Sequence, residues 1–336
     1  MGETEEEIIG VILLNLGGPD SLQAVRPFLY NLFSDREIIR LGPLFLQKPV
    51  AWLISFFRSK KTKRLYSLIG GKSPILNITM AQAKALEGAL NSSLSLQSLH
   101  PPFIKGGRGV FKVYVGMRYW HPFIDEVVPE MHRSGIKRIV ALNMYPQYSH
   151  ATTGSSMSRF KKVLSQYPME VFFITSWFNH PLYIEALVDV IKRGLEGWGD
   201  VHVLFSAHNL PETLIKEGDP YVEQINGTIK EITKRLNIQW HLSYQSKSGP
   251  VKWLEPSTEE MLKRFAEKGF KNILLVPISF VSDHIETLYE IDILYKGLAS
   301  RLGLALKRVD SLNTHPLFIG ALKDIIMKGL KEKGWI

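Results

Sequence analysis

Two short apolar runs constrain the fold of this chain more than any other feature. The first covers residues 8–16 and ends at a Gly-Gly-Pro turn, and the second covers residues 273–276, between Gly269 and Pro277. Runs of this length, rich in branched side chains and without polar alternation, are typical of parallel strands that are covered on both faces. We therefore expect an α/β protein. The remaining predicted strands cover residues 111–117, 137–144, 170–175, 201–205, 240–244 and 304–309.

The second half of the chain resembles the first. Gly135, followed by the strand at 137–144, has a counterpart 134 residues later in Gly269, followed by the strand at 273–276. Each glycine reads as a helix C-cap, and strands that alternate with helices predict right-handed βαβ units. We expect two similar Rossmann-like domains, each a mainly four-stranded parallel sheet flanked by helices, with a cleft between them. The predicted boundaries are 1–176, 177–313 and, for a C-terminal helix that packs back on the first domain, 314–336.

Composition limits the possible functions. The 336 residues are 45% hydrophobic, enough for a core in each domain, and the absence of cysteine excludes disulfides, thiolate zinc sites and iron–sulfur clusters on thiolates. An excess of 41 basic over 32 acidic residues favours an anionic partner, which leaves nucleic acid, an anionic membrane and a carboxylate substrate open. Residues 1–7 carry four glutamates and no apolar core, so we expect no leader peptide and a cytoplasmic location.

One apolar segment, at 41–57, is followed directly by basic residues. It is interrupted by Pro43, Lys48 and Pro49, and is too short to span a bilayer. An interfacial segment at the inner face of a membrane and a buried helix with a solvated end both fit this pattern. The basic residues are Arg58, Lys60, Lys61, Lys63 and Arg64.

The stretch 277–292 places polar residues at the end of a predicted strand, where ligands bind in open parallel sheets. We expect a helix with Ser282 as its N-cap and Asp283 in its first turn. Glu286 and Glu290 then lie four residues apart on one face, where like charges repel. Such a pair fits either a site that faces a cation or a proton path, or an ordinary solvated helix face.

Six segments, in order along nearly the whole chain, resemble ferrochelatases: LLNLGGP at 13–19, IGGKSPI at 69–75, GMRY at 116–119, YPQYS at 145–149, FSAH at 205–208 and VPISF at 276–280. The resemblance implies a chelatase-type fold and a lyase that inserts Fe²⁺ into protoporphyrin IX, the last step of haem synthesis. Protoporphyrin IX and Fe²⁺ are then substrates, and no further cofactor is expected. An anionic membrane surface and an upstream enzyme of the porphyrin pathway are the expected partners, while no nucleic-acid motif is present.

The resemblance also implies roles for single residues. His208 is expected to accept a pyrrole proton, with Glu286 across the same pocket and Glu290 continuing the acidic path. The same three residues are expected to contact Fe²⁺ transiently. The other expected substrate-binding residues are Arg58, Ser73, Gln245 and Ser246 near the propionates, and Leu16, Tyr66, Arg118, Tyr119, Trp253 and His284 along the cleft.

Three departures from the family pattern and three alternatives remain. Asn209 follows the histidine where the family more often has Gly or Ser, and Leu294 stands where a third carboxylate is expected. The chain stops at Ile336 without the cluster-binding extension of animal members, so we expect no iron–sulfur cluster. A coproporphyrin ferrochelatase, a chelatase for another tetrapyrrole and metal, and a non-catalytic porphyrin or haem carrier are the alternative functions.

Overall fold

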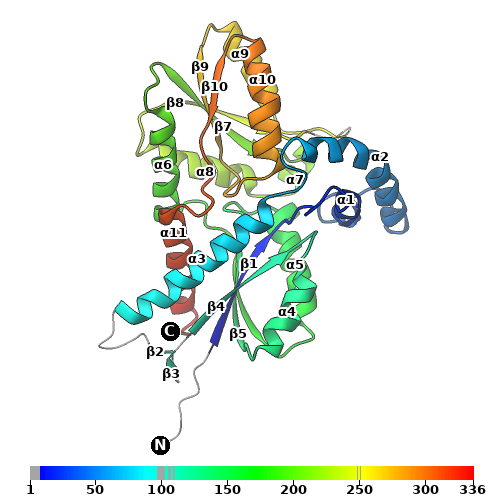
Figure 1. Cartoon of the computed structure of the whole chain (residues 1–336), viewed down its shortest axis with the longest axis vertical. Coiled ribbons are helices and arrows are strands. Elements are labelled where there is room, and N and C mark those ends of the chain that lie inside the picture. The colour runs from blue at the N-terminus through cyan, green and yellow to red at the C-terminus, as the bar shows by residue number, and fades with distance from the viewer. Residues whose placement is uncertain (1–7, 97–102, 105–106, 109, 248, 250) are drawn as a thin grey trace, which may run out of the picture.

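Two parallel four-stranded sheets form the body of the molecule (Figure 1). The computed structural model describes residues 8–96, 103–104, 107–108, 110–247, 249 and 251–336, so the leader prediction for residues 1–7 lies outside the described residues. Both sheets have the same topology, with orders β4-β1-β5-β6 and β8-β7-β9-β10, and this confirms the predicted fold class. The strands are β1 Ile8–Asn15, β4 Val110–Met117, β5 Arg138–Asn143, β6 Glu170–Ile174, β7 Val201–His208, β8 Gln239–Gln245, β9 Asn272–Pro277 and β10 Ala305–Arg308.

Helices connect the strands and cover the sheets. Helix α3 continues to Leu96, and the antiparallel pair β2 Phe103–Ile104 and β3 Gly107–Arg108 follows. The helices are α1 Val25–Ser34, η1 Leu44–Leu46, α2 Gln47–Ser67, α3 Ile75–Leu96, α4 Ile124–Arg133, η2 His150–Gly154, α5 Ser155–Leu164, α6 Pro181–Leu195, α7 Glu212–Lys216, α8 Tyr221–Thr233, α9 Thr258–Glu267, η3 Glu286–Tyr295, α10 Lys296–Arg301 and α11 Pro316–Glu332.

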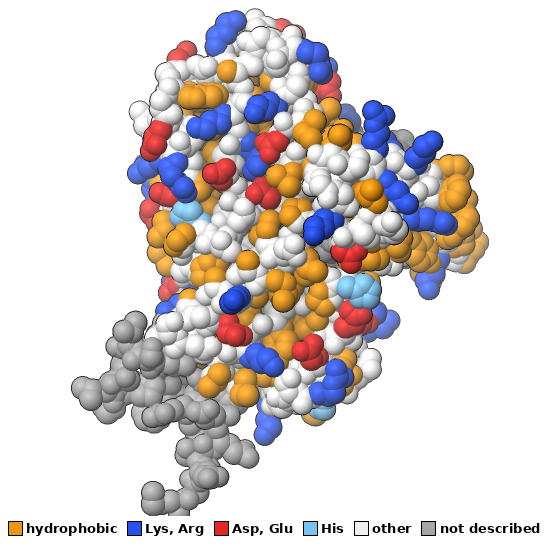
Figure 2. Space-filling view, viewed as in Figure 1, with side chains coloured by type: hydrophobic (Ala, Val, Ile, Leu, Met, Phe, Trp, Pro, Cys, Tyr) orange, Lys and Arg blue, Asp and Glu red, His pale blue; other side chains and the backbone are white. Residues whose placement is uncertain are grey.

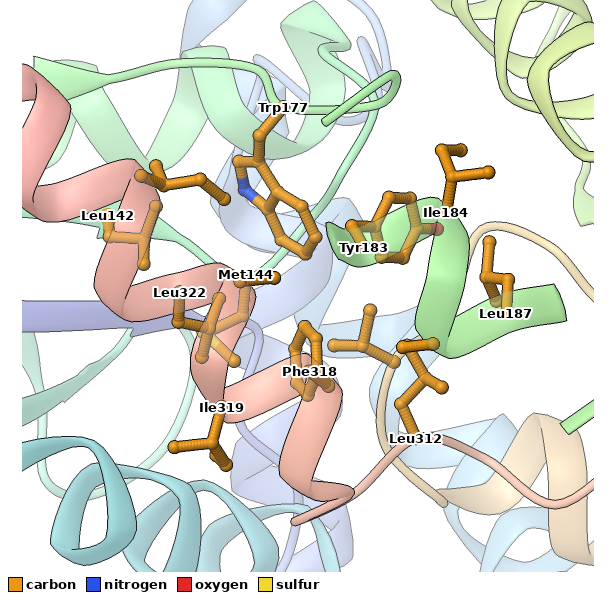
Figure 3. Packing of buried hydrophobic residues seen from close by; sticks show 14 of the residues in the cluster. Leu142, Met144, Trp177, Tyr183, Ile184, Leu187, Leu312, Phe318, Ile319 and Leu322 are labelled. Carbon is orange, nitrogen blue, oxygen red and sulfur yellow. The ribbon is translucent and has the colours of Figure 1, made fainter. Parts of the chain in front are cut away.

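One hydrophobic core is shared by the two sheets. It contains Val11 of β1 and Val276 of β9, both buried, together with side chains of α6 and α11. Figure 3 shows the junction, where Phe318 of α11 and Tyr183 of α6 pack around Trp177, with ring centroids 5.9 and 4.9 Å from the indole. Because the same apolar contacts serve both sheets, the positions of their strand ends are fixed relative to each other.

The last helix of each half covers the sheet of the other half. Helix α6 follows β6 along the chain but packs on β9, and α11 follows β10 but packs on β5 and β6 (Figure 1). A glycine lies at each contact: a Cβ on Gly194 would lie 3.0 Å from Leu274, and one on Gly329 would clash with Phe172. The two halves therefore exchange helices. The predicted domain boundaries stay a prediction.

A repeated sequence accompanies this exchange. The tripeptide His-Pro-Leu leads into both α6 and α11, with its histidines 135 residues apart. His180 Nε2 donates to Asp324 Oδ2 on α11, and His315 Nε2 donates to Asp189 Oδ2 on α6; both distances are 2.9 Å. The same side chains thus form a reciprocal pair of bonds between the two helices.

Helices α1 and α2 project from the body as an arm, and α2 is polar inside and apolar outside. Its buried residues include Gln47, Ala51 and Ser55, and the Gln47 amide donates to two backbone carbonyls at 2.8 and 2.9 Å. From Leu44 onward, the apolar segment at 41–57 is helical. The interpretation of a buried helix is wrong in its burial, because the large apolar side chains of the segment are exposed. Phe45 is 77% exposed and Phe57 is 74% exposed. The others are Leu44, Leu46, Trp52, Leu53 and Phe56.

The arm ends in a mixed apolar and basic surface. Figure 2 shows hydrophobic side chains gathered at the end of the arm, with Lys and Arg side chains beside them. The basic residues from Arg58 to Arg64 lie on α2, which also carries Trp52 and Phe57, and η1 directly precedes this helix. Within the described ranges, we find no helix with the length and apolar character that crossing a bilayer requires.

Candidate active site

His208 and Glu286 meet at the carboxyl end of the second sheet. His208 is the last residue of β7 and pairs with Gln245, the last residue of β8, while Glu286 begins the π-helix η3 that follows β9. His208 Nδ1 lies 2.8 Å from Glu286 Oε2, and the side chains are 37% and 19% exposed. The backbone of His208 is held on both sides, since its N–H donates to Ser279 Oγ and its carbonyl accepts from the Tyr221 hydroxyl.

Ser246 connects this pair to Glu290. Its Oγ lies 2.7 Å from Glu286 Oε2 and 2.5 Å from Glu290 Oε2, and its backbone N–H donates to Glu290 Oε1 at 2.8 Å. The Tyr295 hydroxyl donates to the same Glu290 Oε1 at 2.7 Å. Glu286 and Glu290 therefore lie on one face of η3 in a hydrogen-bonded row, which contradicts the interpretation of an ordinary solvated helix face.

The electrostatics of the row raise the pKa of His208 and of Glu290 and lower the pKa of Glu286, which lies between them. Burial acts to lower the pKa of His208, but the Glu286 carboxylate outweighs it, and the net pKa is raised. Burial acts to raise the pKa of Glu286, but His208 lowers it to about 2. For Glu290, burial and then the charge of Glu286 raise the pKa. A proton is thus held most easily on His208 and on Glu290.

His284 lies beside Glu286 in neutral form. Burial lowers its pKa, and Nδ1 lies 3.0 Å from the Ser282 carbonyl, which accepts only if Nδ1 carries the proton. Nε2 is then unprotonated and lies 3.9 Å from Glu286 Oε1.

The helix after β9 starts later than the sequence predicts. It begins at Ile285 and continues as the π-helix η3, so the prediction of Ser282 as N-cap is wrong. Ser282 is buried and accepts from Gln82 of α3, while Asp283 binds Arg308 of β10 at 3.1 Å. These contacts fix the segment between sheet and helix, and π-helical turns are frequent at functional sites.

An apolar cluster brings the carboxyl end of the first sheet to the same place. Tyr66 of α2 and Tyr119, which follows β4, are buried in it, and Leu16 and Ile285 pack against it. Ile285 directly precedes Glu286. Burial, and next the charge of Glu286, raise the pKa of the Tyr66 phenol, so Tyr66 lies within electrostatic reach of Glu286. Residues of both sheets thus converge around the His208–Glu286 pair.

Comparison with known proteins identifies the group to which this arrangement belongs. The sequence model of the ferrochelatase family matches residues 8–330. The chain belongs to the ferrochelatase family. Among its relatives, a ferrochelatase of Geobacter metallireducens is 50% identical over 329 residues, covering 96% of this chain and 98% of that one. A ferrochelatase of Gloeothece citriformis is 46% identical over 338 residues, covering 97% of this chain and 84% of that one.

Solved structures agree with the fold of a ferrochelatase-family protein. SirB from Bacillus subtilis, solved with Fe³⁺, matches with a TM-score of 0.55 at 11% identity, over 97% of this chain and 98% of that one. DR2241 from Deinococcus radiodurans, a multi-domain protein with structural similarity to chelatases, matches with a TM-score of 0.50 at 11% identity, over 96% and 55%. At this identity the likeness concerns the fold alone.

Arg118, one of the residues that the ferrochelatase resemblance pointed to, is held by an acid that the sequence did not reveal. Its guanidinium lies 2.6 Å from Asp35 Oδ2 and 2.8 Å from Ser155 Oγ. The Tyr119 hydroxyl also donates to Asp35 Oδ2, at 2.6 Å. Burial acts to raise the pKa of Asp35, but Arg118 and the hydroxyl donors outweigh it and lower the pKa. Asp35 ends α1, so this network ties the arm to the body.

The remaining predicted binding residues of this ferrochelatase-family chain lie outside the hydrogen-bonded row. The Arg58 guanidinium lies 5.3 Å from the centre of the Phe33 ring, and Ser73 is buried, with its N–H donating to the Pro19 carbonyl at 2.8 Å. Trp253 forms a bridge with Pro211. Gln245 is fully buried and donates to the Glu286 carbonyl at 3.4 Å, so it supports the first turn of η3. The predicted substrate contacts of these residues stay predictions.

The two substitutions that depart from the ferrochelatase pattern have structural consequences. The Asn209 amide exchanges two hydrogen bonds with the backbone of Leu254, at 3.0 and 3.1 Å, so it fixes the turn after β7. Leu294 is 44% exposed, one turn beyond Glu290. Within the described ranges no group of three or more His, Asp and Glu side chains is placed to hold a metal ion. The predicted transient contacts of Fe²⁺ with His208, Glu286 and Glu290 stay a prediction.

Proposed function

We propose that the chain inserts Fe²⁺ into protoporphyrin IX to form protohaem. The observation that carries the proposal is the His208–Glu286 pair, at the place where residues of both sheets converge, in a member of the ferrochelatase family. Metal insertion requires that two pyrrole N–H protons leave as the cation enters. The site offers a base and an acidic row for those protons.

His208 is suited to accept the first proton. In the neutral imidazole, Nδ1–H donates to Glu286, so Nε2 carries the lone pair and points away from the carboxylate. Glu286 thus selects the tautomer and stabilises the imidazolium that forms when Nε2 takes a proton. An imidazole has a suitable pKa for this task near neutral pH.

The apolar cluster and the arm suit the rest of the substrate. A tetrapyrrole is flat and apolar with acidic edges, and the walls formed by Leu16, Tyr66 and Ile285 match its faces. A saddled ring presents its pyrrole protons to one side, and apolar contacts can hold such strain, at a cost of about 1–5 kcal/mol. Arg58, Ser73 and Ser246 are proposed contacts of the propionates.

We also propose that the arm binds an anionic membrane surface from the cytoplasmic side. Exposed aromatic side chains such as Phe45 of η1 and Phe57 of α2, with a basic cluster on α2, match the apolar and headgroup layers of a lipid surface. A membrane-dissolved porphyrin then enters from the lipid beside the arm.

The experiment follows metal insertion by absorption. Purified protein is mixed anaerobically with Fe²⁺ and either protoporphyrin or coproporphyrin, and the conversion of the porphyrin spectrum is recorded. We expect protohaem, and a loss of about 10²–10⁴-fold in rate in His208→Ala, as for removal of a general base, while protoporphyrin binding is retained. Exclusive use of coproporphyrin, or tight binding of porphyrin without insertion, would establish one of the alternatives instead. Full activity in His208→Ala would refute the role of the base.

A further inference from the structure

Asp35 is a buried carboxylate away from the hydrogen-bonded row, and three side chains donate to one of its oxygens. Oδ2 accepts from Arg118 Nη2, from the Tyr119 hydroxyl and from Ser155 Oγ, each at 2.6 Å. The other oxygen, Oδ1, accepts from the backbone N–H of Glu37 at 2.9 Å. The side chain is 8% exposed. Donors converge in this way on an ionised carboxylate, whose oxygens only accept.

The guanidinium of Arg118 is held at two nitrogens and at one face. Nη2 binds Asp35, Nε donates to Ser155 Oγ at 2.8 Å, and Cζ lies 4.8 Å from the centre of the Tyr119 ring. That ring is itself fixed, because it is buried and its hydroxyl binds Asp35. None of the hydrogen bonds to described residues uses Nη1, and 18% of the Arg118 side chain is exposed. Arg118 therefore keeps a donor group for a ligand while its orientation is set.

The guanidinium lies at the place where residues of both sheets converge. Arg118 directly follows β4, and its neighbour Tyr119 belongs to the apolar cluster against which Ile285 packs. Burial raises the pKa of the Tyr145 phenol, the charge of Arg118 lowers it, and the charge of Glu286 raises it. One phenol is thus within electrostatic reach of both charges. Arg118 is therefore placed to contact a molecule that is bound between the sheets.

The backbone of Asp35 belongs to the arm, whereas its side chain binds the body. Asp35 is the C-cap of α1, and its carbonyl accepts from the Ile39 N–H at 3.1 Å, in the segment that leads to η1. The next residue, Arg36, donates to the Gly42 carbonyl at 2.8 Å in the same segment. The carboxylate that binds Arg118 is therefore anchored by hydrogen-bonded turns of the arm rather than by a flexible surface loop.

We propose that Asp35 is a positioning residue for porphyrin binding, which holds the Arg118 guanidinium on the Tyr119 ring in the orientation that the tetrapyrrole meets. The inference rests on the proposed metal insertion and adds to it a residue that acts through Arg118. An arginine side chain has many rotamers, and fixing one of them during binding reduces affinity. Because Asp35 fixes the rotamer beforehand, the porphyrin binds without this cost.

The test measures protoporphyrin binding and turnover in Asp35→Asn, which keeps the shape of the side chain and removes its charge. We expect KM, and Kd from fluorescence quenching without iron, to rise about 2- to 10-fold, the effect of fixing one long side chain. We expect kcat to stay within about 2-fold of the wild type. A merely structural role gives the opposite result, since loss of folded protein lowers kcat and leaves KM unchanged. Asp125→Asn is the matched control, because it removes another Asp–Arg pair, with Arg159 of α5, and is expected to keep the wild-type constants.

Combining the substitution with Arg118→Ala shows whether Asp35 acts through Arg118. Arg118→Ala alone is expected to raise Kd for protoporphyrin at least as much as Asp35→Asn does. In that background, Asp35→Asn is expected to change Kd by less than about 2-fold, because no guanidinium is left to orient. If Asp35→Asn fails to fold, Ser155→Ala takes its place. It removes the acceptor of Arg118 Nε but keeps the ion pair, and is expected to raise Kd with kcat unchanged.

Two kinds of result overturn the inference. The first is unchanged protoporphyrin binding in Asp35→Asn, or effects that multiply in the double variant. The second is a rise in KM for Fe²⁺ alone, which would show that Asp35 only balances the charge of Arg118. The wild-type protein is measured first, since its failure to insert Fe²⁺ rejects the proposed function, whereas the binding measurements without iron still test Asp35.

Discussion

Replacing Glu286 with Gln tests how far the charge of this carboxyl controls His208. Glutamine keeps the size and the acceptor oxygen but removes the charge. Glu286 Oε2 accepts two hydrogen bonds, from His208 at 2.8 Å and from Ser246 at 2.7 Å. A hydrogen bond to a charged group contributes about 1.5–3 kcal/mol, and one between neutral groups about 1 kcal/mol. Two weakened bonds correspond to a loss of about 1–4 kcal/mol, or about 5- to 1000-fold in kcat.

The pH dependence gives a second and more specific signal. His208 accepts a proton only when neutral, so the rate rises with pH through its pKa, which Glu286 raises above the usual value. Without the Glu286 charge, burial, which lowers the pKa of a histidine, is opposed by the smaller effect of the Glu290 charge. The ascending limb of the rate profile in Glu286→Gln is therefore expected to move to lower pH.

The assay is anaerobic formation of protohaem, followed by absorption from pH 5 to 9. Glu259→Gln is the matched control, because it makes the same change on the exposed face of α9, where Glu259 pairs with Lys263. The control is expected to keep the wild-type rate and profile. An ascending limb that stays in place in Glu286→Gln, whatever happens to kcat, would show that this carboxylate does not set the protonation of His208.

Two further predictions concern the arm and the exchanged helices. Changing Lys60, Lys61 and Arg64 to Gln is expected to weaken sedimentation with anionic vesicles about 100-fold, at about 1 kcal/mol per charge, and equal sedimentation would remove the membrane proposal. Asp189→Asn and Asp324→Asn are each expected to lower the free energy of unfolding in urea by about 1 kcal/mol, and unchanged midpoints would show that the bonds between α6 and α11 add no stability.

The sheets could be predicted from the sequence because each strand is a local apolar run. The run at 273–276 lies within β9, and the predicted polar residues Gln245 and Ser246 lie at the carboxyl end of β8, one as its last residue and the other directly after it. The start of η3 could not be predicted in this way. Ser282 is a good N-cap residue in isolation, but Gln82, 200 residues away, occupies its hydroxyl.

The partners of the site residues depend on contacts that are distant in sequence. Asp35 lies 83 residues from Arg118, and nothing local to either residue indicates the pairing. The Tyr295 hydroxyl reaches Glu290, five residues earlier, on the π-helix η3, and the amino-acid composition does not indicate a π-helix. The helix exchange, in contrast, left a visible signal in the sequence, because His-Pro-Leu leads into both α6 and α11 and an Asp follows it at the same spacing within each helix. The histidines of this repeat are 135 residues apart, whereas the repeat around Gly135 has an offset of 134 residues.

The crossing of α6 and α11 makes the two halves of this polypeptide mutually dependent. A fragment that stops after α6 would lack α11, the helix that covers the first sheet. It would also contain α6 without the second sheet, on which α6 packs. Neither half can therefore be removed, transplanted or rearranged alone. A change in one sheet during evolution had to keep its contact with the helix that the other half supplies.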